Sequence, residues 1–165
     1  MKMHGKNTCE HFLRMVINGI IITSAMIAVT IVLLFICGIR AYIVSTGSME
    51  PQIPIGSMCF INQNCDFQDI QCGDVITFRI SESTVVTHRA VRIDNNAIIT
   101  RGDANSAEDE NAVTAENYIG KYILSIPKAG YVVRFIKSIY GIVAVSGLIL
   151  MLIIADKILD YRKLY

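Results

Sequence analysis

The sequence predicts a mainly β protein, in which a barrel-like β ectodomain is flanked by two transmembrane α-helices. The first observation is composition, because 53% of the 165 residues are hydrophobic and the mean hydropathy is +0.48. An average soluble domain is less apolar than this. The second observation is that two long stretches, one near each end of the chain, contain no charged side chain. The third is a series of short runs between them that are rich in β-branched and aromatic residues.

The first uncharged stretch covers residues 15–39, and Arg14 and Arg40 flank it. About 20 apolar residues are enough for a helix to cross a bilayer. A cleavable signal peptide has a shorter apolar core, of about 7 to 15 residues. We therefore expect a retained transmembrane helix here, and the length of the stretch disfavours the alternative of a buried helix in a soluble core.

The second uncharged stretch covers residues 138–155, and Lys137 and Asp156 flank it. It is short for a transmembrane helix but long enough to cross a bilayer. We expect residues 131–137 to connect this second span to the preceding domain.

Basic residues at both ends of the chain predict its orientation. Cytoplasmic flanks of transmembrane helices carry an excess of lysine and arginine. We therefore expect residues 1–14 and 156–165 to be cytoplasmic, and residues 40–130 to form a domain on the outer side. The basic residues are Lys2, Lys6 and Arg14 before the first span, and Lys157, Arg162 and Lys163 after the second.

The middle segment is expected to consist mostly of strands. Glycine, aspartate and asparagine supply turns at residues 72–74 and 94–96, and the second turn is expected to join two strands as a hairpin. Residues 102–117 form one long polar loop, and such loops in compact domains are usually functional or disordered. The expected strands are Met58–Asn62, Val75–Ile80, Thr84–Ile93, Ala97–Arg101 and Tyr118–Ile126.

Charge and cysteine usage exclude two classes of function. Residues 40–130 hold more acidic than basic side chains, whereas a nucleic-acid-binding domain carries a basic face. The five cysteines include no Cys-x-x-Cys pair and no histidine at zinc-ligand spacing, so we expect no metal site. A disulfide among Cys59, Cys65 and Cys72 remains an open alternative.

Ser48 is the candidate nucleophile. It follows Gly47 and precedes Pro51, and these residues predict a bent backbone that holds the hydroxyl outside regular structure. A serine in such a turn is more often structural than catalytic. Ser48 also lies eight residues beyond Arg40, so an extended chain places it at most about 29 Å from the outer end of the first span.

His88 is the candidate base for this serine. It is the only histidine beyond residue 11, and no lysine occurs between Arg40 and Gly120. Imidazole has an unperturbed pKa near 6.5, so it can accept a hydroxyl proton around neutral pH. A structural histidine is the alternative interpretation of this residue taken alone.

The acidic loop supplies candidates for a carboxylate that orients the imidazole. A catalytic histidine usually needs such a partner on its second nitrogen. The loop follows the strand after the one that carries His88, so it returns beside His88 if the two strands form a hairpin. Asp103 and Asp109 both fit, and a solvated loop or a calcium site is the alternative, although the spacing of EF-hand ligands is absent.

These residues occur in motifs that resemble one known family. Thr46-Gly47-Ser48-Met49-Glu50-Pro51 resembles the Ser-Gly-Ser-Met-Glu-Pro motif around the nucleophile of type I signal peptidases, with threonine for the first serine. Three further boxes resemble those of the family and occur in family order. They are Gly73-Asp74-Val75-Ile76, Thr87-His88-Arg89 and Gly102-Asp103-Ala104-Asn105.

The histidine distinguishes two branches of that family. Most bacterial members have lysine in the base-bearing box. Histidine is typical of the endoplasmic-reticulum subunit and of similar enzymes in archaea and some Gram-positive bacteria. The chain therefore resembles the Ser/His branch, and the lack of lysine between Arg40 and Gly120 agrees with this independently.

The resemblance implies a role for each candidate residue. Ser48 would attack the peptide carbonyl, and His88 would act as general base and then as general acid. We assign Asp109 as the carboxylate that orients His88 and Asp103 as a nearby support, although the residues alone do not separate the two. The Ser48 backbone N–H and the Thr46 hydroxyl would form the oxyanion hole.

The implied function is that of a membrane-bound signal peptidase I, a serine endopeptidase that removes signal peptides without a metal or organic cofactor. Expected partners are preproteins with signal peptides, the lipid bilayer and the secretion machinery, but no nucleic acid. A second span at the C-terminus is typical of prokaryotic members, so we expect a multi-pass protein of the cell membrane. The alternative is a non-enzymatic two-span membrane protein whose β ectodomain binds partners.

Overall fold

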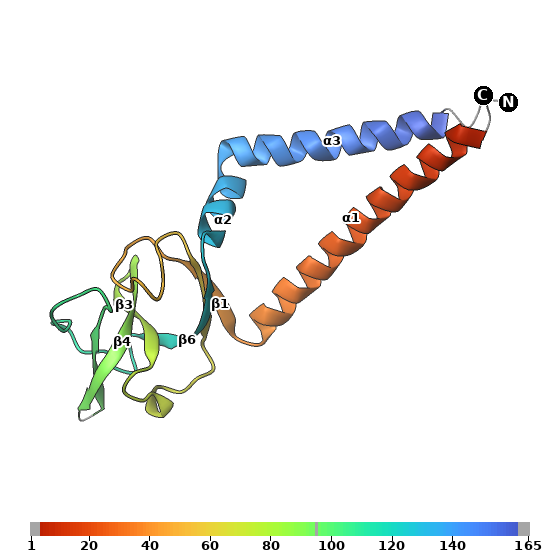
Figure 1. Ribbon diagram of the computed structural model, residues 1–165. Coiled ribbons are helices and arrows are strands. Elements are labelled where there is room, and N and C mark those ends of the chain that lie inside the picture. The colour runs from red at the N-terminus through yellow and green to blue at the C-terminus, as the bar shows by residue number, and fades with distance from the viewer. Residues whose placement is uncertain (1–3, 95, 162–165) are drawn as a thin grey trace. The chain divides into compact units, whose positions relative to one another are not determined.

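The computed structural model describes residues 4–94 and 96–161 (Figure 1). The chain separates into two compact units, of which one comprises residues 34–134 and contains the whole sheet. The other unit consists of the helical residues before and after it. The prediction of a mainly β domain is therefore confirmed.

Six strands form a single sheet in the order β1-β2-β6-β3-β4-β5, and every neighbouring pair is antiparallel. The five expected strands are all present. The hairpin expected at residues 94–96 is also formed, because β4 pairs with β5. The barrel-like form of the sheet stays a prediction. The strands are β1 (Ile39–Ile43), β2 (Met58–Asn62), β3 (Val75–Ser81), β4 (Thr84–Asp94), β5 (Ala97–Arg101) and β6 (Tyr118–Ile126).

The first helix, α1, covers His4–Ile36 and ends earlier than expected. The Gly38 N–H donates a hydrogen bond to the Phe35 carbonyl at 3.2 Å, and Gly38 has a φ of +71°. This left-handed conformation favours glycine and ends the helix. Ile39 then begins strand β1, so the expected C-terminal end of the helix at residue 39 was three residues too late, while the helix itself begins earlier, at His4. The sequence hides this strand because an apolar isoleucine at the end of an uncharged stretch is typical of either structure.

Helix α1 is long and apolar enough to cross a membrane over Arg14–Ile36, and none of that stretch is buried. Two further helices follow the sheet, α2 (Ala129–Lys137) and α3 (Ile139–Tyr161). The expected connection at residues 131–137 is therefore helical. In the described part of the chain, α3 reaches the length and apolar composition of a span only together with α2, and the two helices meet at an angle of 77°, so the second transmembrane helix stays a prediction. Residues 1–3 and 162–165 of the expected cytoplasmic ends lie outside the described residues.

Two apolar clusters form the core of the sheet domain. One contains Ile76 and Phe78 of β3, Ala90 of β4 and Ile98 of β5. The other contains Met49 and Ile53 together with Cys59, Ile61 and Val75. Full burial of one large apolar side chain contributes about 2–3 kcal/mol. Met49 and Ile53 therefore anchor the loop between β1 and β2, which is the loop that carries Ser48.

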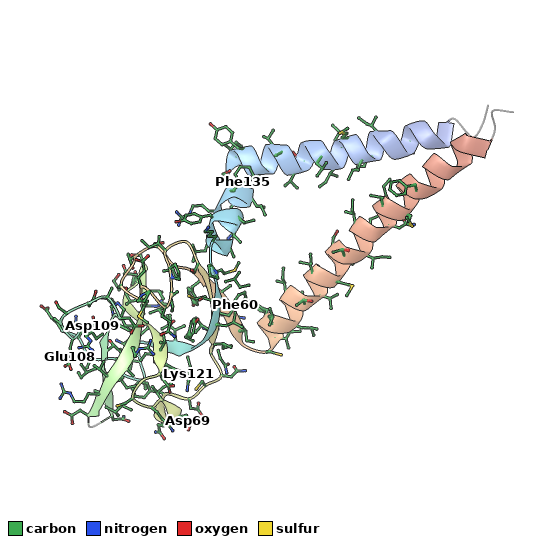
Figure 2. All side chains as sticks on the ribbon, viewed as in Figure 1. Phe60, Asp69, Glu108, Asp109, Lys121 and Phe135 are labelled. Atoms are coloured by element: carbon green, nitrogen blue, oxygen red, sulfur yellow. The ribbon has the colours of Figure 1, made fainter. Side chains whose placement is uncertain are left out.

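An ion pair joins the start of β3 to β6. Lys121 on β6 donates a hydrogen bond to Asp74 at 2.7 Å, and the Gln71 backbone N–H donates to the same carboxylate at 2.9 Å (Figure 2). Burial alone would raise the pKa of Asp74, but the bonds from Lys121 and Gln71 outweigh it and the pKa is lowered. The aspartate therefore stabilises the fold in its ionised form.

The lowered pKa predicts acid-sensitive stability. The stabilisation by Asp74 is complete above the unfolded pKa near 3.9 and is lost as the pH falls through the lower folded value. We expect Asp74→Asn to lower the free energy of unfolding by about 1–2 kcal/mol at pH 7, with the difference from wild type shrinking below pH about 4. Thermal unfolding in detergent, followed by circular dichroism, measures this. Asp69→Asn is the control, and equal melting of D74N and wild type at pH 7 would contradict the prediction.

Candidate active site

Ser48 lies in the loop between β1 and β2, and backbone hydrogen bonds shape this loop. The Glu50 N–H donates to the Gly47 carbonyl at 3.0 Å, and the Ile53 N–H donates to the Met49 carbonyl at 2.8 Å. Met49 is buried directly beside Ser48. These bonds and the buried neighbour hold the Ser48 hydroxyl in one place.

The acidic loop after β5 packs directly against Ser48. The Ala104 N–H donates a hydrogen bond to the Ser48 carbonyl at 2.9 Å. A Cβ atom at Gly102 would lie 2.6 Å from that carbonyl oxygen, closer than any side chain tolerates. Only glycine therefore permits this approach, which gives a physical reason for the Gly102-Asp103 sequence.

His88 lies on β4 with only 7% of its surface exposed. Its Nε2 atom is 3.0 Å from Ser48 Oγ, within hydrogen-bonding distance. The edge of its ring packs against Phe78 of β3, with ring centroids 6.3 Å apart. The imidazole is thus held on a rigid strand and points at the serine hydroxyl.

Asp109 occupies the other side of the imidazole. It lies on the loop that follows β5 (Figure 2), and its Oδ2 atom is 2.6 Å from His88 Nδ1. The Thr100 hydroxyl donates to the same oxygen at 2.6 Å, and the Asp109 N–H donates to the Thr100 carbonyl at 2.8 Å. Thr100 therefore fixes both the backbone and the carboxylate of Asp109. The role of Thr100 could not be predicted from the sequence, because its contact exists only once the loop has folded back onto β5.

Asp103 faces a different partner. The Arg89 guanidinium binds both of its carboxylate oxygens, with Nε to Oδ1 at 2.8 Å and Nη2 to Oδ2 at 2.6 Å. Arg89 also donates to the Gly73 carbonyl at 2.7 Å and to Gln52 Oε1 at 2.6 Å. The hydrogen bond with Asp103 raises the pKa of Arg89, so the guanidinium is always charged. Of the two aspartates that the sequence left open, the structure places Asp109 against His88 and Asp103 against Arg89.

Ser48 and His88 both line a cleft of about 750 Å³. One wall is the extended segment of residues 42–46, which includes Thr46, and the other is formed by Ile80 and residues 83–87 of the β3–β4 hairpin. Among the described residues, none accepts a hydrogen bond from the Ser48 backbone N–H. The cleft can therefore receive a chain beside the serine hydroxyl.

Cys59 also lines this cleft but is a poor alternative nucleophile. Its side chain is fully buried, and burial raises the pKa of its thiol to about 11. The thiolate is the reactive form, so Cys59 is almost entirely unreactive near neutral pH. Cys59, Cys65 and Cys72 are all free thiols, and the disulfide that the sequence left open is not formed. In the described part of the chain, no three metal-ligating side chains come together.

Comparison with protein families identifies the group to which this arrangement belongs. A family described as "Signal peptidase, peptidase S26" matches residues 15–143. The chain belongs to this signal peptidase family. The match covers α1 from residue 15 onward, the whole sheet, α2 and the start of α3.

Curated signal peptidases show the same relationship. Signal peptidase I W of Bacillus subtilis (strain 168) is 41% identical over 83 residues, which cover 48% of this chain and 44% of the relative. The signal peptidase complex catalytic subunit SEC11 of Colletotrichum graminicola is 26% identical over 102 residues, covering 54% and 59% respectively. The same subunit of Metarhizium robertsii is 28% identical over 102 residues, with the same coverage. The chain thus spans about half the length of the curated relatives it matches.

These matches confirm the family and the branch that the sequence motifs predicted, namely type I signal peptidases of the endoplasmic-reticulum and Gram-positive minor type. In this member of the family, Arg89 connects three separate segments. It joins the Ser48 loop through Gln52, the turn before β3 through Gly73, and the acidic loop through Asp103. Arg89 belongs to the base-bearing box in the sequence, but its role and that of Gln52 could not be predicted there, because nothing in the local pattern shows that these loops converge.

The geometry at Arg89 predicts that lysine cannot replace it. A lysine ammonium has no planar fork to bind both oxygens of Asp103 while also reaching Gly73 and Gln52. We expect Arg89→Lys to lower the free energy of unfolding by about 1–3 kcal/mol. Arg92→Lys is the matched control, because the Arg92 side chain is 57% exposed and its ion pairs are long, at 3.4 Å to Glu108 and 3.8 Å to Asp94. Denaturant unfolding in detergent distinguishes them, and an equal effect of the two variants would refute the role of the fork.

Proposed function

We propose that this chain is a membrane-bound signal peptidase I, a serine endopeptidase that removes N-terminal signal peptides from secreted preproteins at the outer membrane surface. The observation that carries the proposal is the line of hydrogen bonds from Ser48 Oγ through the His88 ring to Asp109. A serine hydroxyl becomes nucleophilic when a neighbouring base removes its proton. This arrangement, in a cleft of a family member, supports peptide-bond hydrolysis.

Each residue has a defined role in the proposed reaction. Ser48 Oγ attacks the scissile carbonyl while His88 Nε2 takes its proton, and the imidazolium then donates that proton to the leaving amine. Asp109 holds the ring in the required tautomer and stabilises the imidazolium. Water then hydrolyses the acyl-enzyme with His88 again acting as base. Asp103 acts from further away, through Arg89, as a positioning residue.

The oxyanion of the tetrahedral intermediate needs preorganised donors. We assign the Ser48 backbone N–H and the Thr46 hydroxyl to this role. Two observations support the assignment: the N–H has no acceptor among the described residues, and Thr46 lines the same cleft. Loss of one such donor typically raises the barrier by about 3 kcal/mol.

The substrate is proposed to bind as an extended chain with small side chains before the scissile bond, as in A-x-A-like signal peptide cleavage sites. β5 pairs with residues 89–94 of β4 but not with residues 84–88. One backbone edge of residues 84–88 is therefore not paired with β5, and these residues line the cleft. An extended peptide adds to such an edge through main-chain hydrogen bonds. The apolar lining from Ile43, Val44 and Ile80 suits an apolar signal peptide.

The proposed setting is a cell membrane crossed twice. Helix α1 and the uncharged part of α3 would be the two spans. Both ends of the chain would be cytoplasmic, and residues 40–130 would form a barrel-like domain on the outer side. The uncharged residues 15–36 of α1 and 139–155 of α3 support this placement. Ser48 would then act close to the lipid surface, where signal peptides emerge. The proposed partners are preproteins, lipid and the secretion machinery.

Removal of the nucleophile or the base tests the proposal directly. We expect Ser48→Ala and His88→Ala each to reduce preprotein cleavage by 10⁴-fold or more, because the two act as one unit. Purified protein in lipid vesicles is incubated with a preprotein that carries a standard signal peptide, and mature product is measured on gels. Ser83→Ala, which also lies in the cleft wall, is the control. If S48A or H88A matures the precursor at the wild-type rate, the chain is not this enzyme, and the non-enzymatic alternative takes its place.

The two aspartates are expected to differ in effect. Asp109→Asn should reduce kcat by about 10²–10⁴-fold, because asparagine favours the wrong imidazole tautomer while preserving shape. Asp103→Asn should reduce kcat by less than about tenfold, because Asp103 bonds to Arg89 and not to His88. Single-turnover cleavage by the two variants at matched folded fractions measures this. A larger loss for D103N than for D109N would reverse the assignment.

A further inference from the structure

Helix α2 (Ala129–Lys137) has an unusual distribution of exposure. Its nine residues are strongly segregated into an apolar arc and a polar arc. In a water-soluble domain the apolar arc of such a helix packs on the core. Here the apolar arc is the exposed one, with exposed fractions of 50% for Tyr131, 58% for Val132, 57% for Phe135 and 49% for Ile136.

The opposite side of the helix is the side that docks on the sheet domain. Gly130 is the one buried residue of α2, and its N–H donates a hydrogen bond to the Gly56 carbonyl at 2.9 Å. A Cβ atom at Gly130 would lie 2.7 Å from both that oxygen and Ile43 Cγ2. On a helical wheel, Val132 and Phe135 lie on either side of the direction opposite Gly130. The close docking through glycine therefore turns the centre of the apolar arc away from Gly56. Tyr131, at the edge of the arc, instead packs on that glycine, because a Cβ atom at Gly56 would lie 2.1 Å from the Tyr131 ring.

Basic side chains lie on the polar arc of α2 and directly before the helix. Lys128, Arg134 and Lys137 are all exposed, and none of them forms an ion pair with any residue that the structure describes. Helix α2 itself contains no acidic residue. A helix with an apolar arc and a basic polar arc matches the interface of an anionic bilayer, where acyl chains receive the apolar side chains and headgroups pair with the cations.

Ser138 makes α2 a helix of its own. The Ser138 N–H donates to the Phe135 carbonyl at 3.0 Å, and its hydroxyl donates to the same carbonyl at 2.6 Å. The Ser138 hydroxyl also accepts a hydrogen bond from the Gly141 N–H at 3.2 Å, as a helix N-cap does. Helix α3 then begins at Ile139. The amphipathic pattern of α2 thus ends where the uncharged first part of α3 starts.

We infer that α2 binds the interfacial region of an anionic bilayer through Val132, Phe135 and Ile136, with Arg134 and Lys137 paired to lipid headgroups. This inference rests on the proposed membrane placement of the chain. Its consequence concerns the site, because α2 docks on Gly56, at the end of the Ser48 loop. The Gly56 N–H bonds the Val44 carbonyl at 2.9 Å, next to the cleft wall. Lipid contact at α2 thereby orients the loop that carries Ser48 relative to the bilayer.

The absence of tryptophan from the sequence permits a clean test. Phe135→Trp places a single intrinsic fluorophore on the apolar arc of the full-length protein. The protein is reconstituted into vesicles of phosphatidylglycerol and phosphatidylcholine that contain lipids brominated near the headgroup. Arg134→Trp, on the polar arc of the same helix, is the matched control. Glu110→Trp, in the exposed acidic loop, is the second control.

We expect the bromolipids to quench the Phe135→Trp fluorescence at least threefold more than that of the Glu110→Trp control, with Arg134→Trp between them. Acrylamide in the water should show the reverse order. Equal bromolipid quenching of the F135W and E110W proteins would overturn the inference. Protection of F135W from both quenchers would overturn it as well, because a protein surface and not lipid would then cover α2.

Charge is tested separately. In the Phe135→Trp background, we expect the double substitution Arg134→Gln and Lys137→Gln to reduce the bromolipid quenching at least twofold. The F135W protein without these substitutions should show the same reduction in vesicles of phosphatidylcholine alone. No change in either case would overturn the role of anionic headgroups. Flotation and preprotein cleavage are measured on the same samples. Failure to float would overturn the membrane placement and this inference together, whereas loss of quenching with intact flotation and cleavage would overturn this inference alone.

Discussion

The contact of one imidazole with two loops is the constraint on which the proposed chemistry depends. His88 sits on β4 and is almost fully buried, so its ring direction is set by the strand and by Phe78. Ser48 comes from the loop between β1 and β2, and Asp109 from the loop after β5. Both loops must reach the ring at hydrogen-bonding distance at the same time. Other contacts of the sheet domain bring these two loops to the imidazole ring.

Hydrogen bonds between the loops themselves provide most of this convergence. The Ser48 carbonyl is bound by Ala104, and Gly102 leaves room for the approach. Arg89 is the neighbour of His88 in sequence and so points to the other face of β4, where it binds Asp103, Gln52 and Gly73. One short strand segment thus presents a base on one face and a guanidinium fork on the other. The same strand therefore positions the imidazole and the loops around it.

Contacts of the sheet domain also stabilise the segment where the chain leaves α1. Asn64 donates a hydrogen bond to the Cys37 carbonyl at 3.1 Å, and Arg40 lies 3.6 Å from the centre of the Phe35 ring. These contacts satisfy groups at the end of the apolar helix that would otherwise lack partners.

The sequence alone determined the uncharged first helix, five of the six strands, the family, and the pairing of a serine with the only histidine in the middle segment. These follow from local patterns, because hydrophobicity, turn residues and short motifs are written along the chain. Only the tertiary structure decided that Asp109 faces His88 while Asp103 faces Arg89, and that Thr100 and Gln52 take part. It also decided that Ile39 begins a strand and that α2 exposes its apolar arc. Those outcomes depend on how loops fold back and which groups they meet, and no spacing along the chain encodes such distances.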